Sequence, residues 1–407
     1  RSTNLTNSTT TNSTTHKENF PISFTFQRSE IMSMSDDPSR VVLQCGGRRR
    51  CFDLSVGFAP LLLRGLTLAN GYANGDYGGG AIYSAVAIAV PMSIVNCIFS
   101  NHTSSGDGGA LYFVRVDLTV TSSTFVSNHA DGNGGAIAVD SSTVVLDKVH
   151  FEKNSAGKNG GAVRVTSTLI GTAITMLKTT SLANEAIASG GCFSVLGAVV
   201  KIMKSYFDGD TAKGFQGGGF LVAESATVGL ISTQIYKSRA TTGEGGVISA
   251  MGSKIKLTRV NIADARAAAS GGALALRLCR ATITYSTFQR CTAAGVQGQQ
   301  YLLLNEYLQI QGINVSVEDS KTRMAMDAIL VKSIFEKYMQ SPRIEFDTDS
   351  HYATGIIAEC FQELKSRHTR TLNVHQFSSW FDYYDQLSIH GKELFCSQVS
   401  LYILKKL

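Results

Sequence analysis

Four side chains in the central part of the chain are of the types that bind ligands: Tyr83, Tyr112, Asp140 and Arg164. Aromatic rings and arginine side chains are enriched in binding surfaces. Hydrolysis of a glycosidic bond would require two carboxylates a short distance apart, and an elimination reaction would require a base beside a cation site. Asp140 has Arg164 as its expected neighbour rather than a second acid. The pattern therefore favours ligand binding and predicts no catalytic residue.

Metal binding has weaker support. Asp76, Asp107 and Asp131 precede three successive glycine pairs and could hold Ca²⁺. Tight turns select aspartate beside glycine for their own geometry, however, so we expect no cofactor and keep calcium as an alternative. Four further Cys and His residues near the C-terminus lack metal-ligand spacing, and no metal site is predicted there. They are Cys360, His368, His375 and Cys396.

The elements that must position these residues are copies of one repeat, marked by a glycine pair every 26–30 residues. The first glycines are Gly79, Gly108, Gly134, Gly160, Gly190, Gly217, Gly245 and Gly271. Apolar residues follow three positions later, at Ile82, Leu111, Ile137, Val163, Phe193, Phe220, Ile248 and Leu274. Mostly apolar residues follow five positions later, among them Phe113, Val139, Val165, Val195, Val222 and Leu276. The position between them is mixed, and this period of two predicts a strand with one buried face.

A second set of positions supports the same register. An aromatic or aliphatic residue precedes the glycine pairs, at Phe99, Phe125, Phe151, Phe207, Tyr236, Ile262 and Phe288. A short polar residue follows it at Asn128, Asn154 and Asp210, where we expect a turn. Two further strands are predicted in each copy, for example over residues 143–146 and 148–151.

Three short strands per copy, with no helical crossover between them, predict a parallel β-helix of about nine or ten coils. We expect a disordered Ser/Thr/Asn-rich segment over residues 1–38, the β-helix over 39–317 and an α-helical domain over 318–407. The last domain has the element order of a degenerate EF-hand pair. Its loop positions are not acidic, which disfavours calcium there.

Composition limits the partners. The net charge of +6 is modest for 407 residues and its densest run, residues 48–50, lacks neighbouring aromatics, so no nucleic-acid partner is expected. The uncharged stretch 81–99 has the length of a membrane span, but it fits the repeat and is predicted to form strands rather than a transmembrane segment. Cys45 and Cys51 lie close enough in sequence to bridge a loop. The chain begins at Arg1 rather than Met, which indicates a missing N-terminal part and leaves a signal peptide open.

Five N-x-[ST] sequons are candidate glycosylation sites and, if used, place the chain outside the cell. They begin at Asn4, Asn7, Asn12, Asn101 and Asn314.

The phrases GGA-[ILV], as at residues 134–137 and 160–163, and F-x-x-N, at residues 125–128 and 151–154, resemble the repeat of the polymorphic outer-membrane proteins. The phrase GLTLANG at residues 65–71 resembles β-helix proteins of the pectin-lyase-like class. These resemblances imply a right-handed parallel β-helix, and the first also implies surface display and adhesion. The second implies, as an alternative, a polysaccharide lyase or epimerase acting on acidic glycans. The leading expectation is a secreted or surface-exposed, non-catalytic protein that binds a glycan or a cell-surface protein; a purely structural spacer is a third possibility.

Overall fold

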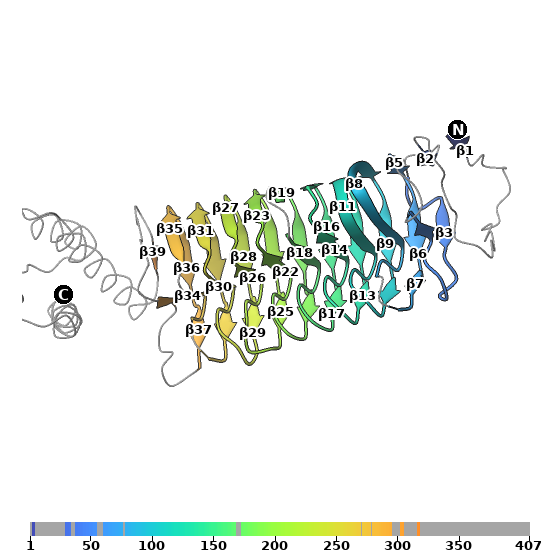
Figure 1. The fold of residues 1–407 in the computed structure, drawn as a ribbon. Helices are drawn as coiled ribbons and strands as arrows, with labels where there is room; N and C mark the ends of the chain where they lie inside the picture. The colour runs from blue at the N-terminus through green and yellow to red at the C-terminus, as the bar shows by residue number, and fades with distance from the viewer. Residues whose placement is uncertain are drawn as a thin grey trace, which may run out of the picture.

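The chain forms a rod of stacked coils, a parallel β-helix, in the computed structural model (Figure 1). The structure describes residues 2–4, 29–33, 37–54, 60–75, 78–167, 172–269, 271–277, 279–294, 302–304 and 316–317. No helix occurs among them. The predicted helical domain over 318–407, with its EF-hand-like segment, lies outside the described residues.

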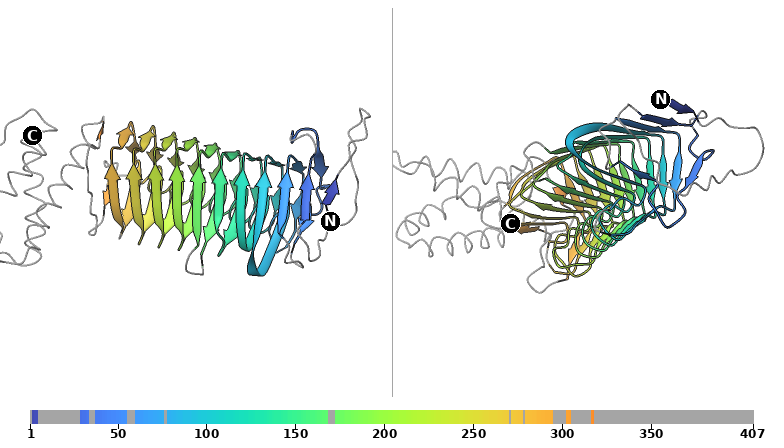
Figure 2. Two further views of the ribbon diagram at one scale, coloured as in Figure 1. Left: turned by 90° about the horizontal axis from the view of Figure 1, so that it is seen from above. Right: turned by 45° about the vertical axis from the view of Figure 1, so that its right-hand side comes forward.

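Three parallel sheets make the walls of the rod (Figure 2). Sheet 1 contains β1 (Ser2–Asn4), β2 (Ser29–Met32), β4 (Phe52–Asp53), β5 (Leu61–Arg64), β8 (Ile82–Val95), β11 (Leu111–Thr121), β14 (Ile137–Asp140), β15 (Val144–Asp147), β18 (Val163–Thr166), β19 (Ala173–Leu177), β22 (Phe193–Leu196), β23 (Val199–Met203), β26 (Leu221–Glu224), β27 (Thr227–Ile231), β30 (Ile248–Met251), β31 (Lys254–Thr258), β34 (Leu274–Arg277), β35 (Arg280–Thr284) and β38 (Leu302–Leu304).

Sheet 2 contains β3 (Val42–Gln44), β6 (Thr67–Ala69), β9 (Ile98–Ser100), β12 (Thr124–Val126), β16 (His150–Glu152), β20 (Thr180–Leu182), β24 (Tyr206–Asp208), β28 (Gln234–Tyr236), β32 (Asn261–Ala263), β36 (Thr287–Gln289) and β39 (Ser316–Val317). Sheet 3 contains β7 (Tyr72–Ala73), β10 (Thr103–Ser104), β13 (His129–Ala130), β17 (Ser155–Ala156), β21 (Glu185–Ala186), β25 (Thr211–Ala212), β29 (Arg239–Ala240), β33 (Arg266–Ala267) and β37 (Thr292–Ala293).

Each regular coil has four strands, one more than the sequence predicted. One coil runs through β13, β14, β15 and β16, and each strand pairs in parallel with its equivalent in the neighbouring coils. The additional strand is the two-residue strand of sheet 3, which is too short to show a period in the sequence. Sheet 3 has nine strands and so counts nine coils, which agrees with the predicted number.

The core is a set of columns that run the length of the rod. Phe99, Phe125 and Phe151 are fully buried, and their rings stack at centroid distances of 4.8 and 5.3 Å. The next coil has Ser181 in this column. Phe193, from β22 of the following coil, packs edge-on against Phe151 beside this smaller side chain.

Two predicted columns are out of register by one residue. After the triple glycine at residues 217–219, Leu221 pairs with Phe193 and faces the core, and Ala223 takes the second core position rather than Val222. In sheet 2, Ile235 rather than Tyr236 pairs with Phe207 and is buried. In both cases an extra loop residue changes the distance in sequence between the core position and the glycine pair. The strand pairing therefore identifies the core residue, and the spacing in sequence does not.

The glycine corners are required by backbone contact between coils. Gly134 has φ +67°, a left-handed conformation that glycine adopts at little cost. Its neighbour Gly135 lies so close to the next coil that a Cβ would overlap the carbonyl oxygens of Gly161 and Ser155. The double glycine is therefore a structural corner, as the sequence indicated.

The other bends use single residues in the left-handed conformation. Lys148, Lys178 and Lys204 have φ of 54°, 51° and 51° at the same bend in three successive coils. Such a conformation costs a side-chain-bearing residue roughly 1 kcal/mol. Nothing in the sequence marks these residues as bends, because glycine and asparagine are the usual choices there.

The uncharged stretch 81–99 forms strands, as predicted. β8 pairs with β11 along both its halves, with a shift in register between them, and β9 follows. Among the described residues no helix has the length and apolar character needed to cross a membrane.

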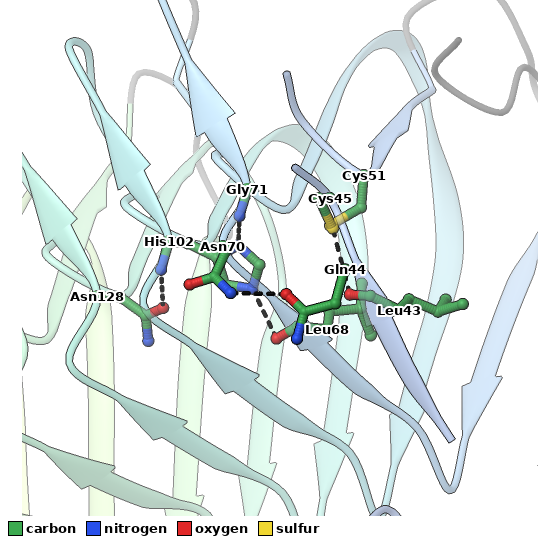
Figure 3. Close-up of a disulfide and its surroundings, with 9 residues drawn as sticks. All are labelled: Leu43, Gln44, Cys45, Cys51, Leu68, Asn70, Gly71, His102 and Asn128. Atoms are coloured by element: carbon green, nitrogen blue, oxygen red, sulfur yellow. Dashed lines mark hydrogen bonds between the residues drawn. A yellow bond between two sulfur atoms is a disulfide. The ribbon is translucent and has the colours of Figure 1, made fainter. Parts of the chain in front are cut away.

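A disulfide joins Cys45 and Cys51 across the turn that follows β3 (Figure 3). The bridge closes the turn after β3, which is the first described strand of sheet 2. Cys97, Cys192, Cys279 and Cys291 are free and buried. Burial raises the pKa of the Cys97 and Cys291 thiols to about 11, so these thiols are inert packing groups.

Candidate binding face

The two predicted tyrosines lie side by side at the N-terminal end of sheet 1. Tyr83 pairs with Tyr112 and their rings stack at 5.8 Å. The Arg50 guanidinium lies 4.8 Å from the centre of the Tyr83 ring and donates to the Asp53 carboxylate at 2.8 Å. Tyr83 is only 7% exposed, so the part of this cluster open to a ligand is Tyr112.

The predicted neighbours Asp140 and Arg164 have other partners. Ala138 pairs with Arg164, whereas Asp140 pairs with Thr166. Arg164 donates to the hydroxyls of Thr166 and Ser194, and Asp140 accepts from Ser141. Burial lowers the pKa of the Arg164 guanidinium, and the charges of Glu224 and Asp107 oppose that shift. The side chains of Asp140 and Arg164 thus stabilise the strands that carry them.

The mixed position of the first strand is less exposed than its composition suggested. Ala138 is 2% exposed and Ser194 is fully buried. Ala138 is small and lies in register between Tyr112 and Arg164, so these larger side chains cover it. The partly exposed side chains of this strand position are therefore separated by buried ones, and ligand binding at Tyr83, Tyr112, Asp140 and Arg164 stays a prediction.

The aspartates considered for calcium are engaged in hydrogen bonds. The Asp107 carboxylate accepts from the backbone N–H of Asn133 at 2.7 Å and from its amide at 3.0 Å, and Asn133 accepts from Asn159 in the same way. Asp131 bonds to His129 at 3.0 Å. Asp76 lies outside the described residues. Within the part of the chain that the structure describes, no group of three or more His, Cys, Asp or Glu residues could hold a metal ion.

A ladder of polar side chains runs through the buried interior of four coil junctions. The backbone N–H of His102 donates to the Asn128 side-chain oxygen at 3.0 Å, and Asn128 donates to Asn154 through its N–H and its amide at 3.0 and 2.9 Å. Asn154 donates to Asn184 and Asn184 to Asp210 in the same manner. All five residues are fully buried. The expected turn asparagines are therefore members of a ladder, to which the sequence had not assigned His102 and Asn184.

Both ends of the ladder are titratable groups. At one end, His102 accepts a hydrogen bond from the Gly71 N–H at 2.9 Å and contacts the Leu68 carbonyl at 2.9 Å (Figure 3). Burial lowers the pKa of His102 to about 4, so the ring is neutral at physiological pH. At the other end, burial raises the pKa of Asp210 to about 7, while hydrogen bonds from Asn184 and Ser181 oppose the shift. Asp210 is fully buried and cannot touch a substrate.

We expect the Asn154→Ala variant to lose about 1–3 kcal/mol of unfolding free energy, because a buried donor left without a partner costs that much. The N–H and amide of Asn128 would lose their acceptor, and the Phe125 carbonyl would lose the Asn154 amide. Urea unfolding of the full chain measures the change. Thr119→Ala, at an exposed position of β11, is the control; equal losses for both variants would contradict a role for the ladder in stability.

A cluster of positive charge occupies the outer side of sheet 1, on the strands β19, β23, β27, β31 and β35. These strands follow one another along the upper side of the rod in Figure 1. Seven exposed basic residues on these strands and their following bends form what we call the basic face: Lys178, Lys201, Lys204, Lys254, Lys256, Arg259 and Arg280. This cluster could not be predicted from the sequence, because only the strand register brings residues from different coils together.

One sequon is accessible in the described structure. Asn101 is exposed and occupies a left-handed bend with φ +55°, so a glycan attached to its amide would project from the rod. Asn4 lies in β1, and Asn7, Asn12 and Asn314 lie outside the described residues. Glycosylation at all five stays a prediction.

Comparison with known protein families identifies one copy of the repeat. The Chlamydia polymorphic membrane protein repeat matches residues 122–140, which contain Phe125, Asn128 and the corner glycines Gly134 and Gly135. No curated protein and no solved structure has significant similarity to the chain. The matched residues form one bend, one core position, one ladder position and one corner of a coil. Repeat sequence and coil geometry together identify a β-helix repeat protein similar to the polymorphic membrane proteins.

Proposed function

We propose that this chain is a surface-exposed, non-catalytic binding protein, whose rigid β-helix presents ligand-binding positions on its outer walls. The observation that carries the proposal is the continuous parallel stack of nine coils, which holds outward side chains at a fixed spacing of about 4.8 Å from coil to coil. A surface location is the one that similarity to the polymorphic membrane proteins suggests. Adhesion to a glycan or to a cell-surface protein is the activity that such a rod would serve.

The acidic residues support binding rather than catalysis. Three carboxylates on the outer walls of the described coils have cationic partners, whereas a glycosidase would need a second carboxylate close by. The pairs are Glu185 with Lys213, Glu244 with Arg277 and Asp264 with Arg290. A cationic partner holds the pKa of Asp264 below its usual range, which is the opposite of what a general acid requires.

Two assays on the full chain test the proposal. Incubation with pectate and alginate, followed by ultraviolet absorbance, detects the unsaturated products of a polysaccharide lyase; we expect none. A screen against immobilised glycans and host cells should detect binding. Product formation would show catalysis and overturn the non-catalytic part of the proposal. A complete lack of ligands in the screen would leave the rod a structural spacer and overturn the binding part.

A further inference from the structure

We propose that the basic face binds a linear acidic polysaccharide that lies along β23, β27 and β31. The inference rests on the proposed binding function and deepens it by naming the ligand class and the wall that takes it. Three observations carry it. The basic side chains have no acidic partners, a glycine in β27 is not required by any internal contact, and threonine hydroxyls lie on the same strands.

The first observation is the charge balance. The five strands with their following bend residues, 173–178, 199–204, 227–232, 254–259 and 280–285, contain seven Lys or Arg residues and no Asp or Glu. The whole chain of 407 residues has a net charge of only +6. None of the seven basic-face residues forms an ion pair within the described part of the chain. Paired lysines occur on the other walls, where Lys153 contacts Glu152 at 2.7 Å and Lys213 contacts Glu185 at 2.5 Å.

The second observation is Gly229, at the centre of β27. In register, Gly229 lies between Lys201 of β23 and Lys256 of β31. Its φ is not in the left-handed region, and a Cβ there would meet only the Val200 carbonyl oxygen at 3.9 Å, which is ordinary contact. A glycine inside a strand weakens it, and such positions often mark where a ligand or another backbone approaches closely. Two lysines therefore flank a gap on the surface that folding does not require.

The third observation concerns the chemical class of the ligand. Thr227, Thr258 and Thr282 lie on β27, β31 and β35 beside the basic residues, and their hydroxyls are suited to hydrogen bonds with sugar hydroxyls. Aromatic platforms for stacking bases are scarce on these strands: Tyr285, at the bend after β35, is their only aromatic residue. No helix or ribbon of the described residues projects from this wall to enter a duplex groove. These features favour an acidic polysaccharide over a nucleic acid.

Basic residues at the bends that follow these strands extend the row of positive charge. Lys178, Lys204 and Arg259 have φ of 51°, 51° and 55°, in the region that glycine or asparagine adopts more readily. The equivalent bend is left-handed in other coils too, at Ser122, Lys148 and Ser232, so the conformation belongs to the fold and only the charge is particular to this wall. At these bends the side chain leaves the end of the strand and extends the row of positive charge beyond Lys201, Lys254 and Lys256.

The test compares two triple variants of the full chain with equal loss of charge. Lys201→Gln/Lys204→Gln/Lys256→Gln removes charge from the basic face. Lys153→Gln/Lys213→Gln/Lys237→Gln removes the same charge from ion-paired lysines on other walls. Affinity for heparin and polygalacturonate oligosaccharides is measured by titration calorimetry at several salt concentrations. We expect the first variant to bind about tenfold more weakly, the second to stay near wild type, and wild-type binding to weaken with salt.

Gly229→Leu tests the gap with no change of charge. We expect a thermal midpoint close to wild type, because the Cβ has open space, and affinity reduced about fivefold, because the side chain occupies the ligand's place. Gly229→Ala is the smaller control.

The inference would be overturned by equal weakening by the two triple variants, by unchanged affinity of Gly229→Leu, or by tighter binding of a DNA duplex or of phosphatidylserine vesicles. Failure with both polyanions together with binding of a neutral glycan or a protein would overturn it and leave the proposed binding function standing.

Discussion

Phe151→Ala should lower the unfolding free energy by about 3–5 kcal/mol, as truncation of a buried phenylalanine does. Phe151 is fully buried, stacks on Phe125 at 5.3 Å and packs edge-on against Phe193 at 6.4 Å. Its removal leaves a cavity that the rigid coils on either side cannot close, because each coil is fixed by hydrogen bonds to its neighbours. Urea unfolding followed by circular dichroism measures the loss.

Lys153→Ala, two residues along the same bend, is the matched control. The Lys153 side chain is 66% exposed and its ion pair with Glu152 lies at the surface, where such pairs contribute little. We expect a change below about 1 kcal/mol. Small and equal effects of the two variants would mean that the phenylalanine column is not the core of the coil.

Asp210→Asn should stabilise the protein at pH 8 by an amount on the order of 2–4 kcal/mol. Burial raises the Asp210 pKa to about 7 in the folded state, against a usual value of 3.8. The stabilising contribution of this proton is fully present below about pH 4, and it is lost as the pH rises to about 7. Asparagine carries no charge to bury and keeps an oxygen for the Asn184 N–H, as the other ladder positions do.

Unfolding titrations at pH 5 and pH 8 measure this effect. The variant should gain most at pH 8 and little near pH 4. Asp264→Asn is the control, because its carboxylate is exposed, is bonded to Arg290 and has a lowered pKa, so its removal should not stabilise the protein at pH 8. A variant less stable than wild type at pH 8 would show that the ladder needs a charged acceptor at its end.

At the other end of the ladder, the dependence of stability on pH has the opposite sign. His102 has a pKa lowered to about 4, so its contribution is lost as the pH falls from about 6.5 toward 4, when the buried ring must take a proton. In the Asp210→Asn variant the ladder keeps only the loss of stability at acid pH that comes from His102. The Asp210→Asn variant should therefore show stability that rises with pH and then stays level.

The coil could be predicted because two sequence features, the glycine pair and the phenylalanine before it, lie close together in sequence and recur in successive copies. The glycine pair and the phenylalanine recur at nearly constant spacing, so the period identifies both the corner and the core side of each strand. The prediction slipped by one residue where a loop gained a residue, as at Tyr236, because spacing alone cannot say on which side of a strand the insertion falls. Strand register decides that question.

The functional surfaces were less predictable for a physical reason. Lys201 and Lys256 belong to different coils, and no property of either residue's own neighbours in sequence shows that Gly229 lies between them. The ladder positions were predicted only where a short polar residue follows a phenylalanine by three residues, at Asn128, Asn154 and Asp210. Asn184 follows Ser181 instead and was missed. His102 fills the same place with a ring nitrogen and a backbone N–H, so a search by residue type misses it.

The constant spacing between Gly108, Gly134 and Gly160 makes the length of the rod a modular property. Residues 134 and 160 hold equivalent places, so removing residues 134–159 would join matching ends of the chain. Asn128 would then donate to Asn184, and Phe125 would take the place of Phe151 beside Phe193. The rod would shorten by one coil, about 4.8 Å, while every surviving column kept its order. Gain or loss of such units would change how far the binding wall reaches without redesigning its interior.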